Sequence, residues 1–136
     1  MTLRNALVKA LEWFERMVDT QSMRFYYVCR AGGKRVHEES PIRDMATVYD
    51  VARLLNCLNI KSPLLEGAMM HTTRWYINNC IQIGTDGMAR WTYLPKGERP
   101  TIAHSAMLIL AIESTRSNAW PQEHLNGMVA MNDGLT

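Results

Sequence analysis

The chain has 136 residues, enough for one ordinary domain, and 47% of them are apolar while 21% are charged. This apolar content can supply a core, which excludes general disorder. The 15 basic and 13 acidic residues leave a formal net charge of +2, too balanced for a typical nucleic-acid binder. No stretch approaches the roughly 18 apolar residues of a membrane-spanning helix. We therefore expect a globular protein with neither nucleic acid nor membrane as a partner.

The N-terminal region and the cysteines bear on location and on metal binding. A secretory signal would need an uninterrupted apolar stretch, which Lys9 and Glu12 interrupt, so we expect a cytoplasmic protein. Cys29, Cys57 and Cys80 form no C-x-x-C pair, which supports neither a disulfide framework nor a zinc site. Because there is also no phosphate-binding glycine motif, the sequence predicts neither a metal nor a cofactor.

The first half of the chain begins with an expected amphipathic helix over residues 2–18, whose apolar residues recur on one face. Residues 24–37 carry a run of strand formers and then a glycine turn at 31–34, which predicts a marginal β-hairpin or an extended loop. Ser40-Pro41 is typical of a helix start, and this second helix should run to about Asn59.

The second half of the chain carries the same kinds of signal in the same order. The expected elements are a third helix opened by Ser62-Pro63 and reaching about 79, a turn at 86–87 with a strand at 90–93, a fourth helix from Thr101, and a short last helix from Trp120 to about 132–134. The fourth helix is apolar on every side over residues 106–112, so we expect it to be buried.

These signals suggest an internal repeat of about 60 residues. A shift of 62 brings four residues of the first helix onto similar ones in the third: Leu3, Ala6, Trp13 and Phe14 onto Leu65, Ala68, Trp75 and Tyr76. A shift of 66 brings the run 24–27 onto 90–93, and a shift of 60 brings Asp44 onto His104. We predict one domain over 1–136, made of repeat 1 (about 2–60), repeat 2 (about 62–118) and a partial repeat 3 (about 120–134).

A unit of two helices and an aromatic extended segment resembles the α/α toroids, which include six-hairpin glycosidase-like and terpenoid-cyclase-like proteins. The segments 86–93 and 101–106 carry the resemblance, because both look like the junction between a strand and an inner helix. It implies a mainly α fold of two to two-and-a-half helical-hairpin repeats, with short β-hairpins or extended segments between them. Since a full ring needs about six hairpins, the chain would be a partial ring that oligomerises, forms an open stack or belongs to a larger protein.

In such toroids the helix starts face the functional opening, so polar residues there are the first candidates. The resemblance implies acid/base roles for Asp44, His104 and Glu98, and ligand binding by Arg43, Tyr27, Trp91, Tyr93 and His37. Each candidate also has a structural alternative. A carboxylate in a first helical turn complements the helix dipole, a histidine there can be held by hydrogen bonds, loop charges are commonly solvated, and aromatic residues are commonly buried.

Two functions remain open from the sequence. The first is a partial α/α toroid that binds a carbohydrate or similar polar ligand, and that processes it if the acid/base residues are catalytic. The second is a non-catalytic helical-repeat module that associates with a second copy or docks on a partner protein, because a short stack of repeats leaves its end faces uncovered. Whether the chain is an enzyme stays open.

Overall fold

The computed structural model describes residues 1–26, 28–36 and 40–115. Tyr27, His37, the last expected helix from Trp120 and the partial repeat 3 lie outside these residues. The described chain is mainly helical, as the sequence predicts. Its helices are α1 (Leu3–Arg16), α2 (Pro41–Leu58), α3 (Pro63–Cys80) and α4 (Ile102–Ser114), and a short 3-10 turn, η1 (Pro95–Gly97), precedes α4.

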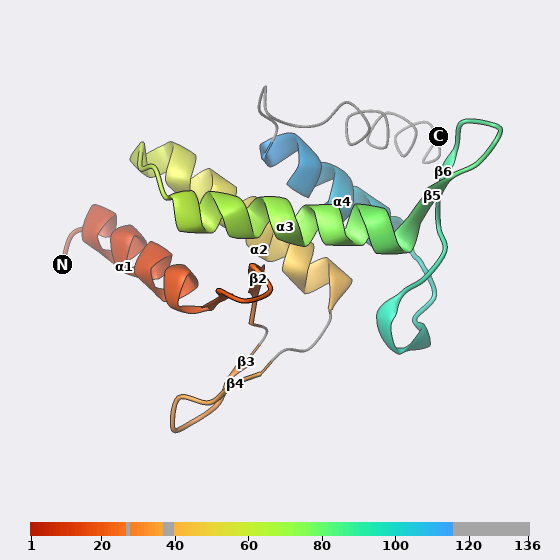
Figure 1. The fold of residues 1–136 in the computed structure, drawn as a ribbon. Coiled ribbons are helices and arrows are strands. Elements are labelled where there is room, and N and C mark those ends of the chain that lie inside the picture. The colour runs from red at the N-terminus through yellow and green to blue at the C-terminus, as the bar shows by residue number, and fades with distance from the viewer. Residues whose placement is uncertain (27, 37–39, 116–136) are drawn as a thin grey trace.

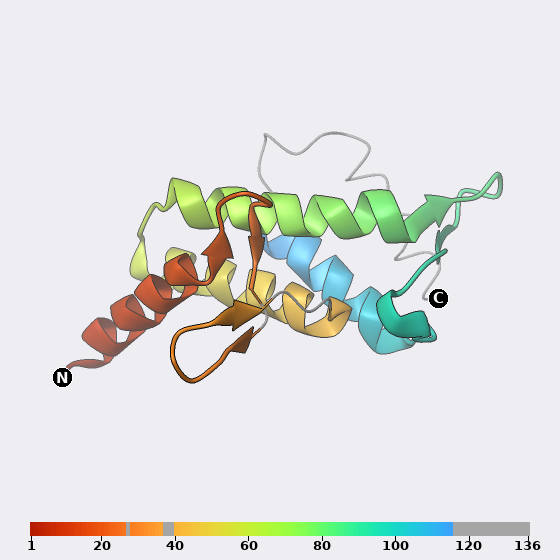
Figure 2. The same cartoon turned by 60° about the horizontal axis from the view of Figure 1, so that its bottom comes forward.

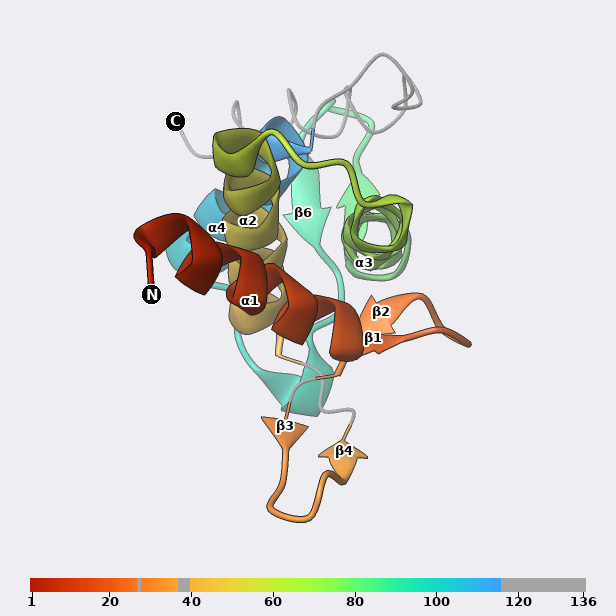
Figure 3. The ribbon, with the colours of Figure 1, turned by 90° about the vertical axis from the view of Figure 1, so that its left-hand side faces the viewer.

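The helices form a bundle in which α2 is central, because the most extensive contact of each of the other three helices is with α2. Helices α1 and α3 run in one direction, and α2 and α4 run in the other (Figures 1 and 2). Figure 3, viewed from the N-terminal side, shows α1 crossing in front of α2, with α4 beyond it. It follows that α2 and α4 begin at the same end of the bundle.

The described strands form three two-stranded antiparallel sheets: β1 (Val18–Asp19) with β2 (Arg24–Phe25), β3 (Val28–Cys29) with β4 (Arg35–Val36), and β5 (Ile81–Ile83) with β6 (Ala89–Trp91). The hairpin predicted within 24–37 is present as β3 and β4, on either side of the glycine turn, but residues 24–25 are not part of it, because β2 pairs back onto β1. Val18 lies opposite Phe25, and both are buried in the core, which favours this pairing. The predicted strand at 90–93 is also shorter, since β6 ends at Trp91.

Helices α1 and α3 each lead directly into a hairpin that is closed in the same way. The backbone N–H of Tyr26 donates to the carbonyl of Met17 at 2.7 Å, and that of Thr92 donates to the carbonyl of Cys80 at 2.8 Å. In both cases the residue just beyond the hairpin returns to the end of the preceding helix. The order of helix, hairpin and helix therefore occurs twice in the described residues.

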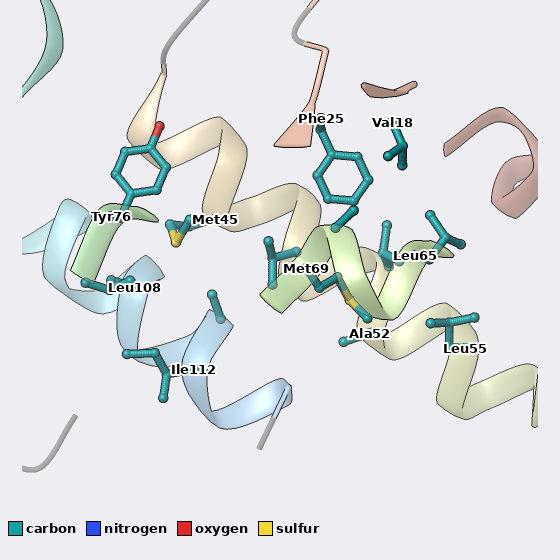
Figure 4. Close-up of a cluster of buried hydrophobic side chains, with 14 of the residues drawn as sticks. Val18, Phe25, Met45, Ala52, Leu55, Leu65, Met69, Tyr76, Leu108 and Ile112 are labelled. Carbon is teal, nitrogen blue, oxygen red and sulfur yellow. The ribbon is translucent and has the colours of Figure 1, made fainter. Parts of the chain in front are cut away.

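The core lies mainly between α2, α3 and α4, and the first hairpin adds Val18 and Phe25 to it (Figure 4). The expectation that α4 is buried is correct for one side, where Leu108 and Ile112 are enclosed. It is wrong for the other side, where Ile102 is 72% and Leu110 is 42% exposed. The reason is that α4 packs chiefly against α2, which covers only part of an apolar helix.

An exposed ion pair holds the turn between β5 and β6. Arg90 donates to both carboxylate oxygens of Asp86, at 2.5 and 3.0 Å, and the backbone N–H of Met88 donates to Oδ1 at 3.0 Å. These hydrogen bonds, that of Arg90 first, lower the pKa of Asp86 from 3.8 to about 2. Because folding lowers this pKa, the pair stabilises the folded chain above pH 3.8 and loses that effect as the pH falls towards 2.

We expect Arg90→Gln to raise the pKa of Asp86 back towards 3.8, because the principal hydrogen bond is lost. NMR titration of the Asp86 carboxyl measures this change, and Lys96→Gln serves as a control that removes another exposed cation. A wild-type pKa already near 3.8, or an equal shift in both variants, would contradict the assigned cause.

Candidate functional site

Three residues singled out from the sequence, Trp91, Glu98 and His104, meet at the start of α4. His104 Nε2 lies 3.4 Å from Glu98 Oε2, and the Trp91 ring meets the imidazole edge to face with centroids 5.9 Å apart. Trp91 Nε1 donates to Ser105 Oγ at 2.9 Å, which fixes the indole against the first turn of α4. His104 is buried, whereas the Glu98 side chain is 49% exposed. The pair thus has one buried and one accessible member.

The hydrogen bonds of His104 determine which tautomer its neutral imidazole ring adopts. The backbone N–H of Thr101 donates to Nδ1 at 3.1 Å, and Thr101 Oγ1 lies 2.9 Å from the same nitrogen. Since a backbone N–H can only donate, Nδ1 is an acceptor, and the neutral ring carries its proton on Nε2, facing Glu98. This contact caps α4, which is the structural alternative for His104. Proton exchange with Glu98 is possible only through Nε2.

Asp44 belongs to a second cluster, which ties α2 to α3 and to β2. The Tyr76 hydroxyl donates to Asp44 Oδ2, and Arg24 Nη2 lies 3.8 Å from the same oxygen. The Arg24 guanidinium also stacks over the Trp75 ring, 4.1 Å from its centroid. Asp44 is only 7% exposed, so its carboxylate is held within the fold. The predicted acid/base residues are therefore divided between two clusters.

A cavity of about 80 Å³ lies beside Asp44, between α1, the first hairpin and α2. Arg43, Asp44 and Thr47 line its polar side. Its aromatic side is lined by Trp13, Phe14, Phe25 and Tyr26. The sequence indicates Arg43 and Asp44 as candidates but not Trp13 or Thr47, because Trp13 stands out in it only as a repeat position. The sequence does contain a signal for Trp13, because Trp13 and Phe14 are adjacent aromatic residues near the end of an amphipathic helix.

The remaining candidate residues predicted from the sequence are Tyr93, Tyr27, His37 and Arg43. Tyr93 follows the end of β6 and is 53% exposed, so its ring is open to contact. Tyr27 and His37 fall outside the described residues. Arg43 is exposed on the first turn of α2, next to Asp44. Of the eight candidates, Trp91, Glu98 and His104 form one cluster, and Arg43 and Asp44 share one cavity.

A larger hollow of about 470 Å³ lies at the opposite end of the bundle. Its walls come from the end of α2, the beginning of α3 and the end of α4, including Asn56, Met69 and Thr115. It contains none of the six candidate residues that the structure describes, and Thr115 is the last residue of the described ranges. The hollow is therefore separate from the two polar clusters.

Comparisons with known proteins assign no family: no family model matches the chain, and the searches of curated proteins and of solved structures found no match. Among residues 1–26, 28–36 and 40–115, no three His, Cys, Asp or Glu side chains gather to hold a metal ion. No helix in the same ranges is both long and apolar enough to cross a membrane. The two polar clusters and the aromatic cavity remain as the basis for a functional assignment.

Proposed function

We propose that the chain is part of an α/α toroid, and that the end where α2 and α4 begin binds a carbohydrate or similar polar ligand. One observation carries the proposal. Candidate residues from both halves of the chain lie at the end where α2 and α4 begin, the shared end that Figures 1 and 2 show: Arg43 and Asp44 line the aromatic cavity at the start of α2, and Glu98 and His104 pair at the start of α4.

The positions buried in α2 and α4 support the underlying repeat. Four positions are buried in both helices at a constant separation of 60 residues: Asp44, Val48, Val51 and Ala52 in α2, and His104, Leu108, Ala111 and Ile112 in α4. The equivalent closures of the two hairpins, at Met17 and at Cys80, support it as well. Two similar helical hairpins side by side are what a segment of a toroid would contain.

The chemistry of the α4 cluster suits a hydroxyl-bearing ligand. The half-exposed Glu98 carboxylate can accept hydrogen bonds from hydroxyl groups, and His104 Nε2 behind it can donate to that carboxylate. A carboxylate and an imidazole in contact are also suited to general acid/base catalysis. Trp91 lies against His104, and the exposed Tyr93 follows two residues later in the chain; both rings have faces on which the apolar side of a sugar ring can stack.

We expect Glu98→Gln to weaken sugar binding by about tenfold, because a hydrogen bond to a charged group is replaced by a neutral one. The fold should tolerate this change, since the side chain is half exposed. Titration calorimetry with a panel of mono- and oligosaccharides, on the full chain, measures the effect. Glu113→Gln is the matched control, because Glu113 is an exposed acid in the last turn of α4.

Equal affinities in the two variants would contradict the role of Glu98, and a wild-type chain that binds no sugar would overturn the proposal. The alternative function is a non-catalytic interaction module. It is supported by Ile102 and Leu110, two large apolar side chains of α4 that are exposed. Failure to bind any sugar, together with a mass in light scattering that rises with concentration, would support this alternative.

A further inference from the structure

The cavity between α1 and α2 combines an apolar wall with a polar one. Trp13 is 45% exposed and meets Phe14 edge to face, with centroids 5.1 Å apart and planes at 75°. Tyr26 is fixed next to them by its backbone hydrogen bond to Met17. The polar residues Arg43, Asp44 and Thr47, from the first two turns of α2, line the opposite wall of the cavity. Such a pairing of rings with a few polar groups is typical of small-molecule sites.

The equivalent tryptophan of the second half differs in one respect. Trp75 occupies the position of Trp13 after a shift of 62, and the Arg24 guanidinium covers its ring at 4.1 Å. Trp13 instead keeps nearly half of its surface exposed at the cavity. A large ring left exposed beside a cavity is a natural surface for a ligand to stack on.

We infer that this cavity is a subsite for one uncharged sugar residue, stacked on Trp13. The inference rests on the proposed function and names the subsite and the class of sugar. Among residues 1–26, 28–36 and 40–115, the cavity wall carries one cation, Arg43, and one anion, Asp44. A cationic ligand would compete with Arg24, which lies 3.8 Å from Asp44, and an anionic ligand would face that same carboxylate. An uncharged ring can instead donate hydroxyl protons to Asp44 and accept hydrogen bonds from Arg43 and Thr47.

The cavity is large enough for only part of a sugar ring, so it can receive the terminal residue of a saccharide. A volume of about 80 Å³ holds a few ordered water molecules but does not enclose a chain of sugar rings. The edge of a terminal ring can enter, and its hydroxyls can form hydrogen bonds with Thr47 and Asp44. The apolar face of the ring then lies on Trp13. The subsite thus binds a terminal residue, and the rest of the saccharide extends outside.

The test compares three monosaccharides on the full chain: methyl glucoside, glucuronate and glucosamine, which are uncharged, anionic and cationic. Saturation-transfer NMR and titration of backbone amides report binding. We expect methyl glucoside to bind most tightly, and Trp13→Ala to weaken its binding by about tenfold. Trp13→Phe should retain most of the affinity. Leu3→Ala, a matched change of an exposed residue on α1, should leave it unchanged.

Preference for glucuronate or glucosamine, or wild-type affinity in Trp13→Ala, would overturn the subsite. If Trp13→Ala binds normally while Glu98→Gln binds weakly, the subsite fails and the proposed function stands. If the wild-type chain binds no sugar at all, both fail.

Discussion

Replacing Asp44 with alanine is expected to lower the free energy of unfolding by about 3–5 kcal/mol. Asp44 is 7% exposed, and its carboxylate accepts the Tyr76 hydroxyl proton and faces Arg24. Without it, a buried hydroxyl and a largely buried guanidinium lose this partner, and the contact that joins α2, α3 and β2 is removed. Urea denaturation followed by circular dichroism measures the loss.

Two variants control this experiment. Tyr76→Phe removes one hydrogen bond to a charged group and keeps the ring, so it should lower the free energy of unfolding by only about 1.5–3 kcal/mol. Asp50→Ala removes an exposed acid from the same helix and should change stability by less than about 0.5 kcal/mol. If Asp44→Ala were no more destabilising than Asp50→Ala, the cluster would not fasten the three elements together.

Leu108→Ala is expected to lower the free energy of unfolding by about 2–5 kcal/mol, because it opens a cavity in a closely packed region. Leu108 has no exposed surface, and Figure 4 shows it near Met45 of α2 and Tyr76 of α3. The lost contacts therefore weaken the packing of α4 on the rest of the bundle. Thermal and urea unfolding of the variant give the magnitude.

Leu110→Ala is the matched control, since it removes the same atoms from the same helix at a position that is 42% exposed. It should lower the free energy of unfolding by about 1 kcal/mol or less. Equal effects of the two substitutions would mean that the orientation of α4 described above is incorrect.

Helix starts could be predicted from the sequence because their chemistry is local. Ser-Pro pairs mark the beginnings of α2 and α3, and both helices start at the proline, as predicted. Ser62 also caps its helix by accepting a hydrogen bond from the Leu65 N–H at 3.3 Å. Ser40 makes no such side-chain bond, although the sequence signal is the same. The start of a helix is thus fixed by proline geometry even where the cap is absent.

Two features could not be predicted: the pairing of the strands, and the separation of the predicted acid/base residues into two clusters. Both depend on contacts between residues that are distant in the sequence. The pairing of β2 with β1 is favoured by burial of Val18 and Phe25 against the helices, which no turn signal encodes. Asp44 finds its partner in Tyr76, 32 residues away in the chain. Asp44 and His104 are both predicted as acid/base residues, and long-range packing gives each of them its own cluster.

The central claim is that the ligand binds at the end of the bundle where α2 and α4 begin. Backbone amide chemical shifts recorded during titration with a saccharide test it directly. The predicted result is a set of saturable shifts in residues 13–14, 43–47 and 98–105, which line the cavity and form the α4 cluster. Shifts confined to residues 55–61 and 66–70, around the hollow at the opposite end, would contradict it.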